Sequence, residues 1–297
     1  MWSANLKDHK FANRWRANIC TNGTLLNRKD VRDFLEEFSG SLNLTISVDG
    51  CPEIQDLNRV FPNGEGTSSE ILNQWEWYLD YCKRSHVYPS TKSTLSRNSI
   101  PYLYESLVYL HEELKLDHIY MNFIMENTHA DDNDYKILDE QLEKCYNYMI
   151  KNPDFYWSFF DESNIGEPFT DQNKKTSRCG SGAMPTLGIN GKIYPCFRWL
   201  PHSVESEEIS NKFILGDVFN GLKNKQGFEE VRESSCWKMS DDECKNCEIQ
   251  SACSYYSEFQ EFKRTKYICN IAKLQSKWTK KYWESIGDKY ESQNNKK

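Results

Sequence analysis

The chain has 297 residues, 38% of them hydrophobic, a mean hydropathy of −0.78 and a formal net charge of −7. An acidic chain is poorly suited to binding phosphate backbones, so no nucleic-acid partner is expected. The first ten residues hold no apolar signal-peptide core, and no run of about 18 apolar residues occurs, so neither secretion nor a membrane span is expected. The predicted compartment is the reducing cytoplasm.

The first 150 residues alternate between strand-like and helix-like segments, which is typical of βα units and a parallel sheet. A strand is predicted over 16–20, followed by Thr21-Asn22-Gly23-Thr24 and a helix. A second strand over 44–48 ends at Asp49-Gly50 and is followed by a polar loop and a helix. Further strands are predicted over 92–95 and 118–124, each followed by a helix. The apolar positions that mark the four helices at a spacing of three to four residues are Val31, Phe34, Leu35 and Phe38; Leu72, Trp75, Leu79 and Cys82; Leu103, Leu107, Leu110 and Leu114; and Leu138, Leu142, Cys145 and Met149.

We therefore predict an α/β domain over 1–150, a linker over 151–175 and a second domain over 176–297. In parallel βα folds, ligands bind at the carboxyl ends of the strands. Here those ends carry Thr21-Asn22-Gly23, Ser47 to Gly50, Ser96 to Asn98, Asn122 and Glu126. Asn-Gly alone most often forms a simple turn, but its place between a strand and a helix favours a ligand site. Cys82 and Cys145 lie on apolar helix faces and are predicted to be core residues.

The second half of the chain is rich in cysteine. Asn190-Gly191 separates two short β-prone runs, which predicts a hairpin with Cys179 and Cys196 at its two ends. Further along, the spacing is Cys244-x2-Cys247-x5-Cys253, with Cys269 fifteen residues later. Disulfides rarely persist in the cytoplasm, so these thiols are predicted to bind metal. Composition alone fits zinc and an iron–sulfur cluster equally.

These motifs, in this order, resemble those of radical SAM enzymes with a C-terminal SPASM domain. The resemblance runs from about Arg16 to Cys269 and is most specific in the segment Gly-Lys-Ile-Tyr-Pro-Cys-Phe-Arg-Trp and the last four cysteines. It points to peptide maturases and anaerobic sulfatase-maturating enzymes. It implies a partial (β/α)6 barrel that binds S-adenosylmethionine, followed by a small cysteine-rich α+β domain with one or two auxiliary [4Fe-4S] clusters. Members cleave S-adenosylmethionine to a radical that abstracts hydrogen from a peptide.

The chain also departs from the family. The radical-generating motif Cys-x3-Cys-x2-Cys occurs nowhere in it. If the strand ending at Thr21 is the fourth barrel strand, this is a half-barrel of about strands 4 to 6 plus one more. The chain is then a fragment, a decayed gene or a split subunit, is not expected to cleave S-adenosylmethionine alone, and would need a separate half carrying that motif.

The resemblance also assigns site residues. The backbone of Thr21, Asn22 and Gly23, with the side chains of Ser47 and Arg59, would lie near S-adenosylmethionine. Judged without the family resemblance, Ser47 is a small residue in a buried strand and Arg59 is a solvated charge in a loop. Cys244, Cys247, Cys253 and Cys269 would form a complete auxiliary cluster site. Cys179, Cys196 and Cys236 would form a second, degenerate site, because Tyr256 and Ser257 stand where a further cysteine is expected. Phe197 replaces the catalytic aspartate of sulfatase-maturating relatives, which disfavours formylglycine formation.

Two classes of function stay open. The first is a radical SAM/SPASM peptide-modifying fragment or subunit, with a peptide or protein substrate. The second is a noncatalytic module, stabilised by zinc or an iron–sulfur cluster, that binds a peptide or partner. About four irons and four sulfides per chain would favour the first, and stoichiometric zinc the second.

Overall fold

The structure is a computed structural model that describes residues 15–124, 130–168, 170, 185–204, 207–227, 229, 242–253 and 266–294. The chain divides into two compact units. Residues 1–161 and 278–297 form unit 1, and residues 162–277 form unit 2. The division into domains predicted from the sequence stays a prediction. Among the described helices, none is both long enough and apolar enough to cross a bilayer.

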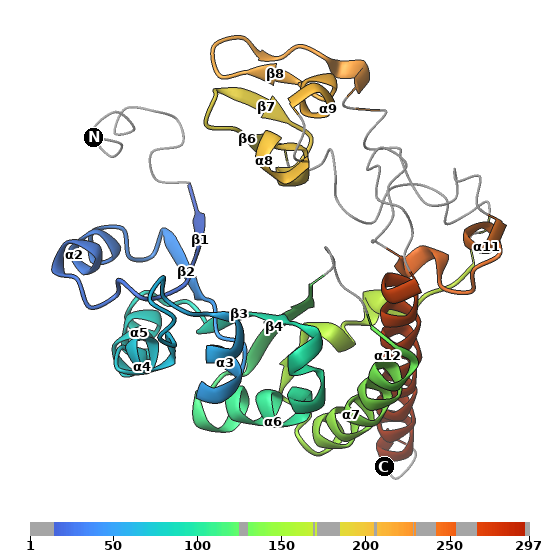
Figure 1. The fold of residues 1–297 in the computed structure, drawn as a ribbon. Coiled ribbons are helices and arrows are strands. Elements are labelled where there is room, and N and C mark those ends of the chain that lie inside the picture. Colours follow the sequence, from blue (N-terminus) through green and yellow to red (C-terminus); the bar gives the residue numbers. More distant parts are fainter. Residues whose placement is uncertain are drawn as a thin grey trace. The chain divides into compact units, whose positions relative to one another are not determined.

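Unit 1 is built on a parallel sheet in the order β1-β2-β3-β4-β5. Its strands are β1 (Ala17–Thr21), β2 (Leu42–Ile46), β3 (Ser90–Leu95), β4 (His118–Phe123) and β5 (Tyr156–Trp157). The helices between them are α2 (Lys29–Glu37), α3 (Pro52–Asn58), α4 (Ser68–Leu72), α5 (Trp75–Arg84), α6 (Leu103–Val108) and α7 (Asp132–Lys151). Figure 1 shows these helices along one side of the sheet. The predicted parallel βα architecture is confirmed.

Alternation along the strands gives the sheet two different faces. In β2, Leu42, Leu44 and Ile46 are buried, while the residues between them are only partly buried. The same period separates the buried Ile119, Met121 and Phe123 of β4 from its exposed neighbours. We call the second face the polar face; its strand residues are Asn18, Cys20, Asn43, Thr45, Ser90, Lys92, Thr94, His118, Tyr120 and Asn122. Within unit 1 the helices cover the apolar face, so the polar face can accommodate a ligand.

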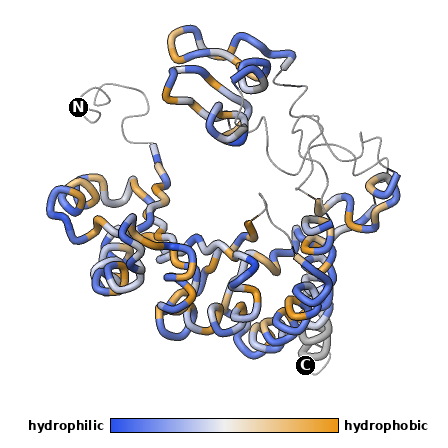
Figure 2. The backbone as a smooth tube through the Cα atoms, viewed as in Figure 1, coloured by the Kyte–Doolittle hydropathy of each residue, from blue (hydrophilic) through white to orange (hydrophobic). Residues whose placement is uncertain are grey.

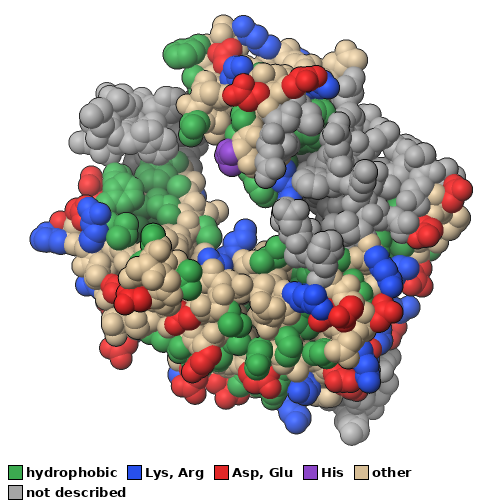
Figure 3. Space-filling model, viewed as in Figure 1, with side chains coloured by type: hydrophobic (Ala, Val, Ile, Leu, Met, Phe, Trp, Pro, Cys, Tyr) green, Lys and Arg blue, Asp and Glu red, His purple; other side chains and the backbone are tan. Residues whose placement is uncertain are grey.

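The helices pack with their apolar stripes against the other face. The side chains of Leu103, Leu107 and Leu110 are fully buried, as the sequence pattern predicts. Hydrophobic and hydrophilic residues alternate along the helices in Figure 2. Helix α7 begins at a capping box, in which the Asp131 carboxylate accepts from the Asp134 amide and the Asp134 carboxylate accepts from the Asp131 amide. Lys, Arg, Asp and Glu side chains intermingle on the outer surface in Figure 3.

The long helix α12 (Lys266–Asn294) starts in unit 2, and its second half packs in unit 1. There Trp278 Nε1 donates to Asp139 Oδ1 over 2.6 Å, and Trp283 Nε1 donates to the Phe160 carbonyl over 2.9 Å. α12 therefore belongs partly to each unit.

Four short helical turns complete unit 1 and the start of unit 2: η1 (Arg97–Tyr102), the π-helical η2 (Tyr109–Glu113), η3 (Ser158–Phe160) and η4 (Glu162–Asn164).

Unit 2 contains a small antiparallel sheet in the order β6-β7-β8-β9. The strands are β6 (Thr186–Leu187), β7 (Lys192–Tyr194), β8 (Gly216–Asp217) and β9 (Gly221–Leu222). Short helical segments accompany them: η5 (Phe197–Trp199), α8 (Pro201–Val204), α9 (Glu207–Lys212), α11 (Asp242–Lys245) and η7 (Gln250–Ala252). The pairing of Thr186 with Tyr194 confirms the predicted hairpin, which turns at Gly191 with a φ of 75°.

Several elements differ from the sequence prediction. Strand β2 lies two residues earlier than the predicted 44–48, and β3 begins at Ser90, two residues before the predicted 92–95. The segment predicted as a polar loop after Gly50 forms α3 and α4, because Ile54 and Ile71 supply buried apolar anchors within a polar stretch. Strand β5 lies inside the predicted linker, where its two residues pair with His118 and Ile119 of β4.

Candidate functional site

The carboxyl ends of β1 and β2 meet directly. The Ser47 amide donates to the Thr21 carbonyl over 2.8 Å, and Cys20 Sγ lies 3.8 Å from Ser47 Oγ. The structure therefore brings together two of the predicted ligand-binding segments, at the edge where parallel βα folds bind ligands.

The turn after β1 requires glycine at one position. Gly23 has a φ of 79°, and a Cβ there would lie 2.8 Å from Ile46 Cγ2. The Gly23 amide donates to Thr21 Oγ1 over 3.2 Å, and the Thr24 amide donates to Asn22 Oδ1 over 3.2 Å. Thus the turn is fixed by its own side chains and by close packing against β2.

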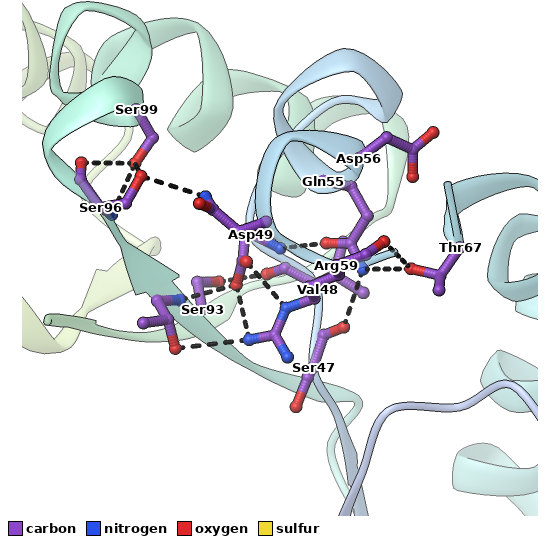
Figure 4. A network of polar contacts seen from close by, with 12 residues as sticks. Ser47, Val48, Asp49, Gln55, Asp56, Arg59, Thr67, Ser93, Ser96 and Ser99 are labelled. Carbon is purple, nitrogen blue, oxygen red and sulfur yellow. Dashed lines mark hydrogen bonds and ion pairs between the residues drawn. The ribbon is translucent and has the colours of Figure 1, made fainter. Parts of the chain in front are cut away.

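A buried ion pair stabilises the next strand end. Arg59 Nε donates to Asp49 Oδ2 over 2.7 Å, and its Nη2 donates to Asp49 Oδ1 over 2.9 Å. The Asp49 side chain is 2% exposed and that of Arg59 is 25% exposed. The Thr94 amide, on β3, also donates to Asp49 Oδ1 over 2.7 Å. The carboxylate thus ties β2 and β3 together and fixes the guanidinium beside Ser47 (Figure 4).

A second layer of hydrogen bonds holds this ion pair. The Asp49 amide donates to Gln55 Oε1 over 2.8 Å, and Thr67 Oγ1 donates to the Arg59 carbonyl over 2.9 Å. At the end of α3, Asn58 Nδ2 donates to Ser96 Oγ, just after β3, over 3.0 Å. These contacts join α3, the start of α4 and the end of β3 into one network, so the site is preorganised by at least three elements.

The edge offers a defined chemistry. Arg59 supplies guanidinium N–H groups whose charge is already paired with Asp49, Ser47 supplies a hydroxyl beside an exposed thiol, and the turn after Thr21 supplies a set of backbone groups. Such a set suits a polar ligand that carries a carboxylate and hydroxyl groups. Burial raises the pKa of the nearby Cys51 thiol, which disfavours its thiolate.

The cysteines of the second half are distributed over several segments. Cys196 precedes η5, Cys244 lies in α11, and Cys269 lies in α12; each is partly buried. The Cys247 amide donates to the Cys244 carbonyl over 3.3 Å, which closes a tight turn between these two. Cys179 and Cys236 lie outside the described residues. Among the described residues, no group of three or more His, Cys, Asp or Glu side chains is arranged to hold a metal ion.

Cys82 and Cys145 are core residues, as predicted. Both are fully buried, and burial raises the pKa of Cys82 to about 11 and that of Cys145 further. Neither is suited to act as a nucleophile near neutral pH.

Sequence reasoning placed Ser47, Arg59 and Thr21 to Gly23 at the site and did not assign roles to Asp49, Gln55, Thr67 and Thr94. Asp49 follows a buried strand, which is a signal for a site residue. Nothing in the spacing reveals that Arg59, ten residues later, is its ion-pair partner.

No family model and no curated protein matches the sequence. The structure is similar to solved structures of anSMEcpe, an anaerobic sulfatase-maturating enzyme of the radical SAM/SPASM kind. Native anSMEcpe with bound AdoMet and Cp18Cys peptide has a TM-score of 0.64 and 17% identity, covering 93% of this chain and 76% of that one. Native anSMEcpe with bound AdoMet and Kp18Cys peptide has a TM-score of 0.63 and 16% identity, covering 92% and 76%. Native anSMEcpe with bound AdoMet alone has a TM-score of 0.63 and 18% identity, covering 92% and 75%. The chain therefore has a mixed α/β fold like that of radical SAM enzyme structures.

Proposed function

We propose that this protein binds S-adenosylmethionine at the carboxyl edge of its parallel sheet and acts in peptide modification, as a maturase of the radical SAM/SPASM kind. One observation carries the proposal: the likeness to anSMEcpe with bound AdoMet and peptide extends over 93% of the chain. The ordered edge around Ser47 and Arg59 supports it, because this is where the fold is expected to bind its cofactor.

The described residues suit the cofactor. S-adenosylmethionine has a carboxylate, ribose hydroxyls and an adenine ring. The guanidinium of Arg59 matches the carboxylate, Ser47 can exchange hydrogen bonds with a hydroxyl, and the backbone of Thr21 to Gly23 offers further groups. When bound and reduced, the cofactor supplies the radical that abstracts hydrogen from a peptide. The residues of this chain bind and orient it.

For the auxiliary cluster, the cysteine thiols have the right chemistry, but the described ones are not arranged as a ligand set. We propose Cys244, Cys247, Cys253 and Cys269 as ligands of a [4Fe-4S] cluster, with Cys179, Cys196 and Cys236 as a second, incomplete set, since thiolates are the usual ligands of such clusters. The described cysteines do not form a ligand cage in the structure, so no step of the reaction is assigned to a cluster.

The proposal leaves radical generation to another component. These 297 residues hold no Cys-x3-Cys-x2-Cys motif, so we propose that the reducing cluster comes from outside them, for example from a separate polypeptide with that motif. In this arrangement the present chain contributes the cofactor-binding edge and the peptide-binding role. A mixture of both chains would cleave S-adenosylmethionine, and this chain alone would not.

Equilibrium dialysis of the anaerobically purified full chain with labelled S-adenosylmethionine tests the proposal. We expect one saturable site per chain. Arg59→Gln should weaken binding by about tenfold, the equivalent of one lost charge-assisted contact. Arg28→Gln is the matched control, since Arg28 is exposed and, among the described residues, its side chain pairs with Asp30 in the first turn of α2. Absence of saturable binding, or equal effects of the two variants, would contradict the proposal.

Metal analysis of the same sample separates the two classes of function. About four irons and four sulfides per chain are expected for the maturase kind. Stoichiometric zinc without iron would instead indicate a noncatalytic metal-stabilised module.

A further inference from the structure

A cavity opens on the polar face of unit 1, at the amino ends of the strands. It has a volume of about 590 Å³ and is lined by nine residues: Arg16, Asn18, Asn43, His86, Val87, Tyr88, Ser90, His118 and Tyr120. Asn43 is four residues before Ser47 on the same strand, which corresponds to about 13 Å at the rise of a β-strand. This cavity is therefore distinct from the carboxyl edge, and its size is in the range of small-molecule sites.

The charge of the cavity favours an anion. Arg16 is positive, and none of the nine described residues that line it is acidic. The Arg16 guanidinium donates to the Gly40 carbonyl, and Trp15 packs on Phe38 with ring centroids 5.9 Å apart, so the two residues just before β1 are held by the segment that follows α2. Because a guanidinium has five N–H donors, one carbonyl contact leaves donors for a carboxylate or a phosphate.

Amide and hydroxyl groups supplement this charge. Asn18 pairs in register with Asn43, so two amide side chains lie side by side on the polar face. Among the described residues, no donor reaches the buried Oδ1 of Asn43. An unsatisfied buried acceptor costs about 1–3 kcal/mol. Rotation of the Asn43 amide towards the cavity would let a ligand or water remove that cost.

An aromatic wall borders the same cavity. The rings of Tyr88 and His118 have centroids 5.3 Å apart, and Tyr156 lies 5.7 Å from His118 and 5.9 Å from Tyr120. Tyr88 is 76% exposed and Tyr120 is 47% exposed. Tyrosines that are exposed in a row present π-faces on which a flat ring can stack.

His86 adds a local irregularity. It follows the end of α5, where its amide donates to the Lys83 carbonyl and the next amide, of Val87, donates to the Cys82 carbonyl. This is a Schellman motif, whose left-handed position favours glycine, yet His86 occupies it with a φ of 54°. A histidine costs roughly 1 kcal/mol more than glycine there, and its side chain lines the cavity. His86 therefore makes the end of α5 less favourable and places a polar ring in the lining of the cavity.

We propose that this cavity binds a small ligand that carries an oxyanion on a flat ring, in a site separate from the one proposed for S-adenosylmethionine. Arg16 would bind the oxyanion, the paired asparagines would exchange hydrogen bonds with it, and Tyr88 with Tyr120 would stack on the ring. The oxyanion is either a carboxylate or a phosphate, and both present oxygens that a guanidinium binds in a bidentate manner.

The test uses the full chain with two probes, benzoate for the carboxylate and phenyl phosphate for the phosphate, and follows binding by isothermal titration and ligand-observed NMR. We expect saturable binding of at least one probe, and the probe that binds identifies the oxyanion. Arg16→Gln should weaken it by about tenfold, and Tyr88→Ala by about fivefold. Raising the salt concentration should also weaken it, since a charge is recognised.

Matched controls exclude a general effect. Tyr102→Ala removes a tyrosine that is 49% exposed and does not line the cavity, so it should leave affinity unchanged. Saturating S-adenosylmethionine should not displace the probe. The inference is overturned if neither probe saturates by about 10 mM, if both cavity variants bind like wild type, or if S-adenosylmethionine displaces the bound probe.

Discussion

Removing Arg59 and removing Asp49 should lower the free energy of unfolding by different amounts. Two single variants measure the difference. Arg59→Met leaves the Asp49 carboxylate, whose side chain is 2% exposed, without its counter-charge. Breaking a buried pair in this way costs about 3–5 kcal/mol. Asp49→Asn leaves an arginine whose side chain is 25% exposed and still partly hydrated. The asparagine oxygen can still accept from the Thr94 amide, so the expected cost is about 1–3 kcal/mol.

Urea unfolding of the full chain, followed by circular dichroism, gives the free energies. Arg84→Met is the matched control, because its pairs with Glu36 and Asp80 are exposed, with side-chain exposures of 44% for Arg84, 38% for Glu36 and 62% for Asp80, and each is expected to contribute about 0–1 kcal/mol. The double variant Asp49→Asn/Arg59→Met should cost less than the sum of the single variants, since it leaves no unpaired charge. If Arg59→Met costs no more than Arg84→Met, or if Asp49→Asn is the more harmful change, the reasoning about this network is wrong.

Three further predictions concern the same unit. Gly23→Ala should lower stability by about 1–2 kcal/mol in thermal unfolding, because alanine must then adopt a positive φ and its Cβ lies 2.8 Å from Ile46 Cγ2. Gly64→Ala is the control for φ alone, because a Cβ at Gly64 meets nothing within 4 Å. Equal losses in the two variants would refute the packing argument. Burial raises the pKa of Tyr78 far above its usual value, so the stability that its neutral phenol contributes is complete below about pH 10 and is lost as the pH rises above that. Tyr78→Phe should therefore flatten the decline of stability at alkaline pH. An unchanged slope of stability against pH would contradict this prediction. Cys20 should react with a thiol reagent at pH 8 before unfolding, whereas Cys82 and Cys145 should react only on unfolding; rapid labelling of either, read by mass spectrometry of peptides, would contradict their burial.

The sequence predicts the βα architecture well because its signals are local. Leu103, Leu107 and Leu110 repeat at helical spacing, and all three are buried in the structure. The Asn190-Gly191 turn likewise identifies a hairpin from two residues, since few others adopt the required backbone. Strand β2 was placed two residues late because Val48 continues the apolar run beyond the last paired residue, Ile46.

Features that depend on pairing across the sheet could not be predicted from the sequence. Strand β5 has only two residues, and its identity comes from pairing with His118 and Ile119, not from its own composition. At the site, the position of Arg59 after a polar stretch is compatible with a solvated charge. Its partnership with Asp49 arises because α3 turns the chain back towards the end of β2. The four-cysteine spacing predicts metal binding, and it does so without specifying which side chains approach one another.

The central claim is that S-adenosylmethionine binds where β1 and β2 end. Hydrogen–deuterium exchange of the full chain, with and without S-adenosylmethionine, tests it most directly. The account predicts slower exchange in peptides that cover residues 20–25 and 46–50, with no change over 84–90 at the amino end of the sheet. Unchanged exchange at the carboxyl edge in the presence of saturating S-adenosylmethionine, or slowing confined to 84–90, would contradict it.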